Sequence, residues 1–235
     1  MIMNRMSKLI SLISLITLAS IQIPAFAQDC KAYFPTEEGS ELTYEMFNKR
    51  DKLEGTMVQK LSSIDKSGDT TIFNIHQKMF DKKDELLYEG DLQFKCHGNK
   101  FYLDMNSFIN PEQFKAYENM EMEVTMDDIT LPDQLEVGME LDEGFIKMAI
   151  DAQMMTMNFN TRIFNRKVEA KETLSTPAGS FETYKISSST ESKTPMMTIT
   201  TSSTTWYSEE YGMIKTENYD KKGKLEAYSV LVKID

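Results

Sequence analysis

The chain has 235 residues, of which 37 are Asp or Glu and 26 are Lys or Arg, and its formal net charge is −11. This acidic balance argues against binding to nucleic acid or to anionic membrane surfaces, because charges of the same sign repel. The length allows one sizeable hydrophobic core but is short for two domains.

The N-terminus has the three parts of a secretory signal peptide. Arg5 and Lys8 come before an apolar run over residues 9–23, and an Ala-x-Ala cleavage site ends at Ala27. The apolar run has about 15 residues, whereas a membrane-spanning helix needs about 20. We therefore expect cleavage after Ala27 and export to the periplasm or to the cell exterior.

The expected organisation is a signal peptide over residues 1–27 and a single β domain over residues 28–235. Cys30 stands close to the cleavage site, as the acylated cysteine of a lipoprotein would. The residue before it is Asp29, however, whereas acylation requires a small residue there. We therefore favour a protein without a lipid anchor. No later segment reaches the apolar length of a membrane span, so we expect no transmembrane segment after signal removal.

Cys30 and Cys96 are the two cysteines of the chain, and both follow the signal peptide. An even number of cysteines in an oxidising compartment predicts a disulfide bond. Closing a loop of this length would stabilise the fold by about 4 kcal/mol, because it constrains the unfolded chain. The bond would attach the start of the mature chain to a strand. Two unpaired thiols are the alternative.

Alternation of apolar and polar residues predicts strands along the chain. The residues expected to share one face are Thr71, Phe73, Ile75, Gln77 and Met79 in one run, Leu92, Phe94 and Cys96 in a second, and Tyr228, Val230, Val232 and Ile234 in a third. Gly98 and Asn99, which follow the second run, form a two-residue hairpin signal.

One turn pattern occurs three times, over residues 47–54, 80–86 and 219–226. Each copy has an aromatic residue that ends a strand, an Asn or Asp that can bond its own backbone, two cations, and a residue that tolerates positive φ. We interpret this repeat as hairpin chemistry rather than as a ligand motif. It implies a meander of antiparallel strands, about a dozen in all, as in a sandwich or barrel.

One short helix is predicted among these strands. Asn110 is a good N-cap, and Pro111 suits the first helical turn. Phe114 and Tyr117 are three residues apart and would face inward, and the helix should end near Asn119.

Motifs that carry catalysis are missing from the sequence. His76 and His97 are the only histidines, and neither has a Cys or carboxylate at metal-ligand spacing. The sequence also lacks the zinc-protease, Cys-x-x-Cys, nucleophile-elbow and phosphate-binding glycine patterns. Catalysis by carboxylates alone, as in glycosidases, stays open. We therefore expect a protein that is not an enzyme and holds no cofactor or metal.

An acidic stretch over residues 116–146 holds ten carboxylates and no Lys or Arg. Clustered carboxylates can bind calcium, but the spacing of an EF-hand is missing. Charge runs are usually solvated, so we favour a solvated or partner-facing loop. Asp127 and Asp128 lie within it and are the residues whose charge reversal would test a partner-facing role.

Methionine is unusually frequent, with 18 residues in the chain. Thioether clusters can bind Cu(I), but no His or Cys accompanies them here. Adaptable packing, in the core or around an apolar ligand, is the favoured interpretation. Alternation places Met155, Met157 and Phe159 on one strand face. With Trp206, these three residues are our candidates for an apolar ligand face.

Several segments resemble a known group of proteins. Residues 30–40, 176–185, 206–215 and 219–225 resemble the TapB-like family of exported bacterial proteins of unknown function. The Pro-Ala-Gly segment at residues 177–179 and the Trp-Tyr pair also recur in a wider group that is similar in fold to lipoprotein carriers. This resemblance implies a mainly β fold, in which a strongly curved antiparallel sheet, a half-barrel, surrounds one short helix. It also implies a concave apolar face for a lipid or acyl chain, and it brings no catalytic residues.

The leading hypothesis is thus a non-enzymatic envelope protein that binds a lipid, another apolar ligand or a partner's hydrophobic segment in its curved sheet. A sheet that encloses a fully packed core would argue against an enclosed ligand. The alternative is an envelope assembly or protein-interaction factor that acts through its acidic surface.

Overall fold

The computed structural model describes residues 31–105, 120–151 and 155–235. The predicted signal peptide, Cys30 and the predicted helix near residues 110–119 lie outside these ranges. In the described ranges, no helix has the length and apolar character needed to cross a membrane.

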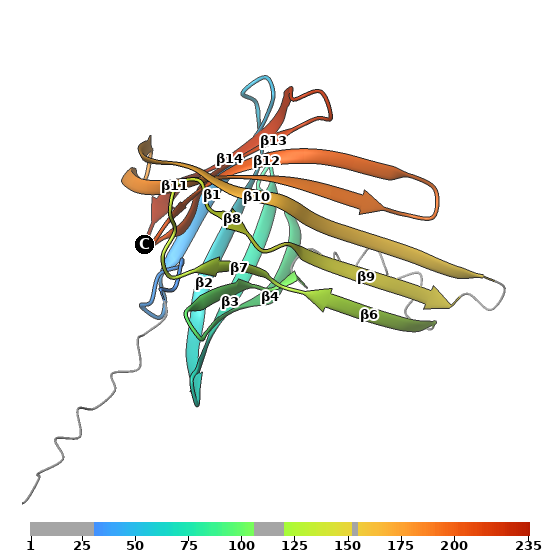
Figure 1. The fold of residues 1–235 in the computed structure, drawn as a ribbon. Coiled ribbons are helices and arrows are strands. Elements are labelled where there is room, and N and C mark those ends of the chain that lie inside the picture. The colour runs from blue at the N-terminus through green and yellow to red at the C-terminus, as the bar shows by residue number, and fades with distance from the viewer. Residues whose placement is uncertain (1–30, 106–119, 152–154) are drawn as a thin grey trace, which may run out of the picture.

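Fourteen strands in the described part of the chain form one sheet, and every pairing is antiparallel (Figure 1). The strand order is β6-β9-β10-β11-β12-β13-β14-β1-β2-β3-β4-β5-β7, and β8 pairs with β10 beside this path. The strands are β1 (Glu41–Asn48), β2 (Leu53–Ser67), β3 (Thr70–Asp81), β4 (Leu86–His97), β5 (Lys100–Leu103), β6 (Glu121–Asp127), β7 (Ile129–Pro132), β8 (Glu140–Leu141), β9 (Gly144–Asp151), β10 (Thr156–Thr176), β11 (Gly179–Lys193), β12 (Thr198–Ser208), β13 (Gly212–Tyr219) and β14 (Leu225–Ile234).

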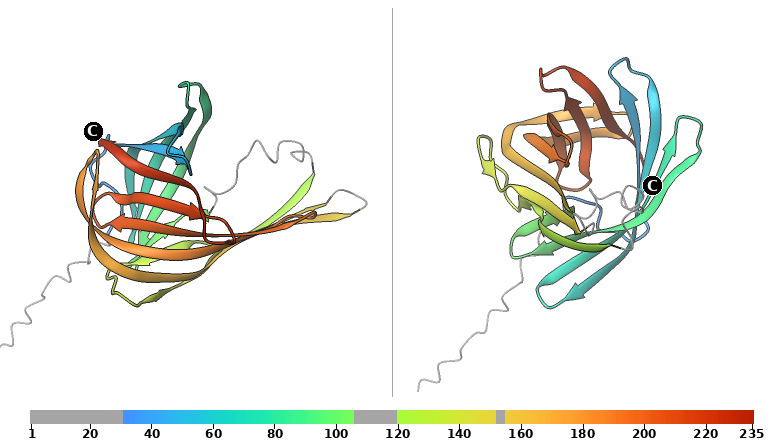
Figure 2. Two further views of the ribbon diagram at one scale, coloured as in Figure 1. Left: turned by 90° about the horizontal axis from the view of Figure 1, so that it is seen from above. Right: turned by 90° about the vertical axis from the view of Figure 1, so that its right-hand side faces the viewer.

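The sheet curls until it nearly closes into a barrel (Figure 2). Its two end strands, β6 and β7, follow each other in the chain through Asp128. Across the seam, the buried Arg166 of β10 donates hydrogen bonds to the carbonyl oxygens of Thr130 in β7, at 3.0 Å, and of Asp142, at 2.6 Å. The prediction of a mainly β protein with a strongly curved antiparallel sheet is confirmed, and the curvature goes beyond a half-barrel.

The turn pattern that occurs three times in the sequence forms the same turn each time. The Oδ1 atoms of Asn48, Asp81 and Asp220 each accept hydrogen bonds from the backbone N–H groups two and four residues later. The residue that must tolerate positive φ is Asp51, Asp84 or Gly223, with φ of 56°, 63° and 73°. The hairpin predicted at Gly98 and Asn99 also forms and joins β4 to β5.

The predicted strand faces agree with the core in β3 and β4 but only in part in β14, where Ile234 packs against the core. Phe73 and Ile75 of β3 are buried, as are the three predicted residues of β4. In β14 the fully buried residue is Leu231, which the alternation assigned to the other face. A β-bulge opposite Thr43 and Tyr44 leaves Val232 out of the pairing, so the side chains that point inward change there from odd-numbered to even-numbered residues.

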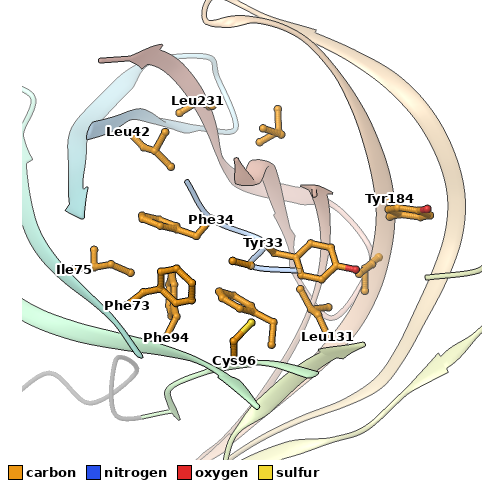
Figure 3. Packing of buried hydrophobic residues seen from close by; sticks show 14 of the residues in the cluster. Tyr33, Phe34, Leu42, Phe73, Ile75, Phe94, Cys96, Leu131, Tyr184 and Leu231 are labelled. Atoms are coloured by element: carbon orange, nitrogen blue, oxygen red, sulfur yellow. The ribbon is translucent and has the colours of Figure 1, made fainter. Parts of the chain in front are cut away.

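The segment before β1 fills the interior of the curved sheet. Figure 3 shows Tyr33 and Phe34 between side chains from opposite walls, and Ala32 is buried beside them. The Phe34 ring meets Phe94 edge-on, with 5.4 Å between centroids, and the Tyr33 hydroxyl donates to the Pro132 carbonyl at 2.8 Å. The centre of the barrel is therefore packed by the protein's own N-terminal segment.

Gly212 permits this arrangement at the start of β13. Its φ is +71°, and a Cβ atom there would lie 2.2 Å from the carbonyl oxygen of Tyr33. Only a glycine lets the two backbones approach so closely. Cys96 is also buried in this core. Since its expected partner Cys30 lies outside the described residues, the disulfide stays a prediction.

A candidate binding surface on the distal arm

Part of the sheet continues beyond the packed barrel as a projecting arm (Figure 2, left). We call this the distal arm and define it as β6, β9, residues 156–164 of β10, residues 189–193 of β11 and residues 198–201 of β12. Strand β13 pairs with β12 only from Ser202 onwards, so it does not extend along the arm.

Strands β6, β9 and β10 make the arm amphipathic. Residues paired across an antiparallel ladder point to the same face of the sheet. The register therefore places three rows of neighbours on one face, namely Met122–Ile150–Met157, Val124–Met148–Phe159 and Met126–Ile146–Thr161. The opposite face carries Glu121, Glu123, Lys147, Asn158, Asn160 and Arg162.

The apolar face is covered over its central strand and open at its rim. Ile146, Met148 and Ile150 of β9 are buried. On the neighbouring edge strand, Met122 and Val124 are each 38% exposed. Met155, just before β10, is 61% exposed. Apolar contact with another molecule is therefore available along β6 and at the start of β10.

The β11–β12 hairpin adds a second open apolar region at the end of the arm. Met196 is 92% exposed and Met197 is 56% exposed, while the backbone that carries them is held in place. The Thr194 hydroxyl accepts hydrogen bonds from both of their N–H groups, at 3.3 and 3.2 Å, and the Thr194 N–H donates to the Met197 carbonyl at 2.9 Å. The two side chains thus project into solvent from an ordered turn.

Exposed apolar side chains concentrate on this arm. Of the eleven large hydrophobic residues that are exposed in the described ranges, seven lie on the arm or at its ends. They are Met120, Met122, Val124, Met155, Met196, Met197 and Ile199. Such a concentration marks an interaction surface more often than single exposed residues do.

The four residues predicted as a ligand face do not all lie together. Met155 lies directly before the β10 strand of the arm, and Met157 and Phe159 belong to the arm. Trp206 does not, because it lies in the part of β12 next to the barrel and its ring is covered by other groups. Its Nε1 donates to Glu172 at 2.6 Å, and the ammonium groups of Lys185 and Lys215 lie 5.2 and 5.3 Å from the ring centroid.

Sequence reasoning missed the contribution of β6, although the signal was present. Residues 121–127 read Glu-Met-Glu-Val-Thr-Met-Asp, which is a strict alternation. The acidic composition led us to expect a loop, whereas the structure has an amphipathic strand. Its carboxylates point to one face and Met122, Val124 and Met126 to the other.

Other acids of the same stretch have structural partners. The Asp128 carboxylate accepts the N–H of Met105 at 3.0 Å. Asp142 binds the Lys100 ammonium at 2.8 Å, and this hydrogen bond holds the pKa of Asp142 below its usual range. Reversing the charge of Asp128 would therefore disturb the fold as well as any surface.

Both histidines contact carboxylates in the structure, although the spacing of these residues in the sequence did not predict it. Pairing of β3 with β4 brings Asp91 within 2.7 Å and Glu89 within 2.9 Å of the His76 ring nitrogens. These hydrogen bonds, led by the one to Asp91, raise the pKa of His76. His97 contacts Asp69 at 3.3 Å. Both groups lie on exposed sheet surface, and no cluster in the described ranges is arranged to hold a metal ion.

A cavity of about 670 Å³ opens between the N-terminal segment and strands β2 to β4. Its lining is mixed, since Ile64 and Phe73 stand beside Glu38 and Lys66. The Glu38 carboxylate accepts the N–H of Ile64 at 2.9 Å, so it braces the wall. This cavity lies beside the packed core rather than along the apolar arm.

Two solved structures share the fold of this chain. A candidate exported protein with a YmcC-like fold from Bacteroides fragilis shares 22% identity, with a TM-score of 0.69, over 88% of this chain and 100% of that chain. A candidate lipoprotein from Parabacteroides distasonis shares 22% identity, with a TM-score of 0.72, over the same fractions. At this level of identity the likeness shows the fold.

The comparison with curated proteins gave no match. The narrower TapB-like resemblance stays a prediction. The DUF3108-like family matches residues 37–231, which is most of the chain. The chain therefore belongs to the DUF3108-like family.

Proposed function

We propose that this protein is a non-catalytic exported binding protein whose distal arm holds a hydrophobic segment of a partner protein. The observation that carries the proposal is the row of open apolar side chains along β6 and the arm ends, among them Met122, Val124 and Met197. The predicted signal peptide supports export. So does the description of two structural neighbours as a candidate exported protein and a candidate lipoprotein.

A partner segment fits the structure better than an enclosed lipid. Tyr33 and Phe34 occupy the centre of the barrel, and the cavity beside them has a mixed lining that includes Glu38 and Lys66, which suits an acyl chain poorly. The open apolar residues lie on a projecting surface, where a segment of another protein can lie against them.

The proposal is tested by photo-crosslinking in the native envelope. A photo-reactive residue replaces Val124, and the matched control carries it at Leu87, an exposed apolar residue of β4 outside the arm. We expect a discrete protein adduct from position 124 and none from position 87. Adducts of lipid mass alone would instead indicate an apolar small molecule. Equal labelling from both positions would contradict a specific surface.

Two variants of β6 distinguish the proposal from the alternative in which the partner binds the acidic surface. Met122→Ser with Val124→Ser removes the exposed apolar side chains of β6, whereas Glu121→Lys with Glu123→Lys reverses two of the charges on its other face. We expect the first pair to abolish the adduct, with the probe placed at Met197, and the second pair to preserve it at all salt concentrations. Loss in the second pair only, together with salt-sensitive labelling, would favour partner binding through the acidic surface.

A further inference from the structure

The outer part of β12 is a sheet edge that no described strand covers. Residues 198–201 pair with β11 through Lys193↔Thr198 to Thr190↔Thr201, and the ladder from β13 stops at Ser202. All four residues are exposed. Their backbone groups on the side away from β11 therefore pair with no strand in the described ranges.

The register shows which backbone groups these are. The hydrogen bond from the Thr194 N–H to the Met197 carbonyl marks that pair as hydrogen-bonded. Antiparallel ladders alternate between hydrogen-bonded and non-hydrogen-bonded pairs, and this one has no bulge between Lys193 and Tyr184. Thr198 and Thr200 are therefore in non-hydrogen-bonded pairs, and their N–H and C=O groups point to the open edge.

This edge lacks the features that usually prevent strand addition. Residues 198–201 read Thr-Ile-Thr-Thr, all β-branched, without charge or proline. The other edge of the arm is different, because β6 carries Glu121, Glu123 and Asp127. One edge of the arm is thus protected by charge, and the other is ordered and open.

We propose that the β12 edge, residues 198–201, receives an extended, uncharged segment of the partner protein as an added antiparallel or parallel strand. This inference rests on the proposed function, since it names how the partner is held. Ile199 lies in the row Thr161–Ser192–Ile199, on the apolar face of the arm. An added strand with apolar residues at alternate positions would extend that face and reach Met197 at the tip.

A segment without acidic residues is favoured over a second copy of this chain. Two copies would each bring a formal net charge of −11, and this repulsion opposes self-pairing at the edge. The strand β12 is already ordered by its ladder with β11, so pairing with a foreign segment requires little further ordering of this protein.

The test uses the full mature protein with a photo-reactive probe at Met197 and three variants at one position. Thr200→Pro removes an N–H that points to the open edge and leaves the β11 ladder intact. Thr200→Lys adds an edge charge, and Thr200→Val keeps both the N–H and the branched shape. We expect the first two to reduce the adduct at least about tenfold and the valine variant to change it less than about twofold. Unchanged circular dichroism and melting temperature confirm folding of each variant.

The outcomes separate this inference from the proposed function. If Thr200→Pro and Thr200→Lys label as well as the parent while the Met122→Ser, Val124→Ser pair does not, strand addition is wrong and the apolar surface stands. If all variants label equally, both are wrong. An adduct with the mass of two copies of this chain would also overturn the proposal, because it would identify the occupant as a second copy.

Discussion

Replacing Phe34 by Ala tests whether the N-terminal segment is a fixed part of the core. Phe34 is buried, and its ring meets Phe94 edge-on in the middle of the barrel. Truncating a buried Phe to Ala costs about 3–5 kcal/mol, from the lost transfer free energy and the cavity left behind. The described part of the segment that enters the core is short, residues 32–35, and it can shift to fill the space, so we expect about 3 kcal/mol.

The measurement is urea unfolding of the mature protein, followed by the fluorescence of Trp206, the only tryptophan of the chain. Leu87→Ala serves as the control, since Leu87 is exposed and its loss should change the free energy of unfolding by less than about 0.5 kcal/mol. A loss below about 1 kcal/mol for Phe34→Ala, with an unchanged urea slope, would refute the argument. The segment would then be a loosely held plug, and an interior ligand would become plausible again.

Two further predictions concern backbone approach and pH. Gly212→Ala should destabilise the protein by about 2 kcal/mol more than Gly223→Ala, because both have φ near +70° but only at Gly212 would the new Cβ meet a backbone oxygen, that of Tyr33; equal losses in urea unfolding would show that the segment does not lie against β13. The raised pKa of His76 means that its pairs with Asp91 and Glu89 stabilise the fold fully below the unfolded pKa of about 6.5, and that this contribution is lost as pH rises through the folded pKa. The stability difference between the parent and His76→Gln should therefore shrink from pH 5 to pH 9, and a difference that is constant or grows would contradict the assignment.

Local chemistry allowed the turns to be predicted, because each turn depends on a few adjacent residues. Asn48, Asp81 and Asp220 bond their own backbones whatever the rest of the chain does. Burial on β3 was predictable for a similar reason, since the extra residue of the nearby β-bulge lies in β2 and the alternation of Phe73 and Ile75 in β3 is unbroken. At Val232 in β14 a β-bulge interrupts the alternation. No residue near it in the sequence indicates that the inward-facing side changes there.

The candidate site could not be predicted in full from the sequence, because it depends on strand pairings between distant segments. The sequence shows methionines grouped at residues 120–122, 154–157 and 196–197. Only the register shows that Met122 and Met157 flank the same residue, Ile150. The meeting of His76 with Asp91 likewise follows from the β3–β4 register. Filling of the barrel by Tyr33 and Phe34 could not be read from periodicity, because the segment that contains them is not a strand.

The acidic residues of β6 have a physical role that needs no charged partner. Strand β6 is an edge strand with an apolar face, and such a strand would pair with other chains unless something prevented it. Glu121, Glu123 and Asp127 supply repulsion and hydration there without interrupting the apolar row on the other face. The β12 edge carries no such charges. Charged residues at Thr198 or Thr200 would prevent unwanted strand pairing at little cost in stability, since both side chains are exposed. The contrast between the two edges of one arm is therefore the feature that points to β12 as the side on which another strand is received.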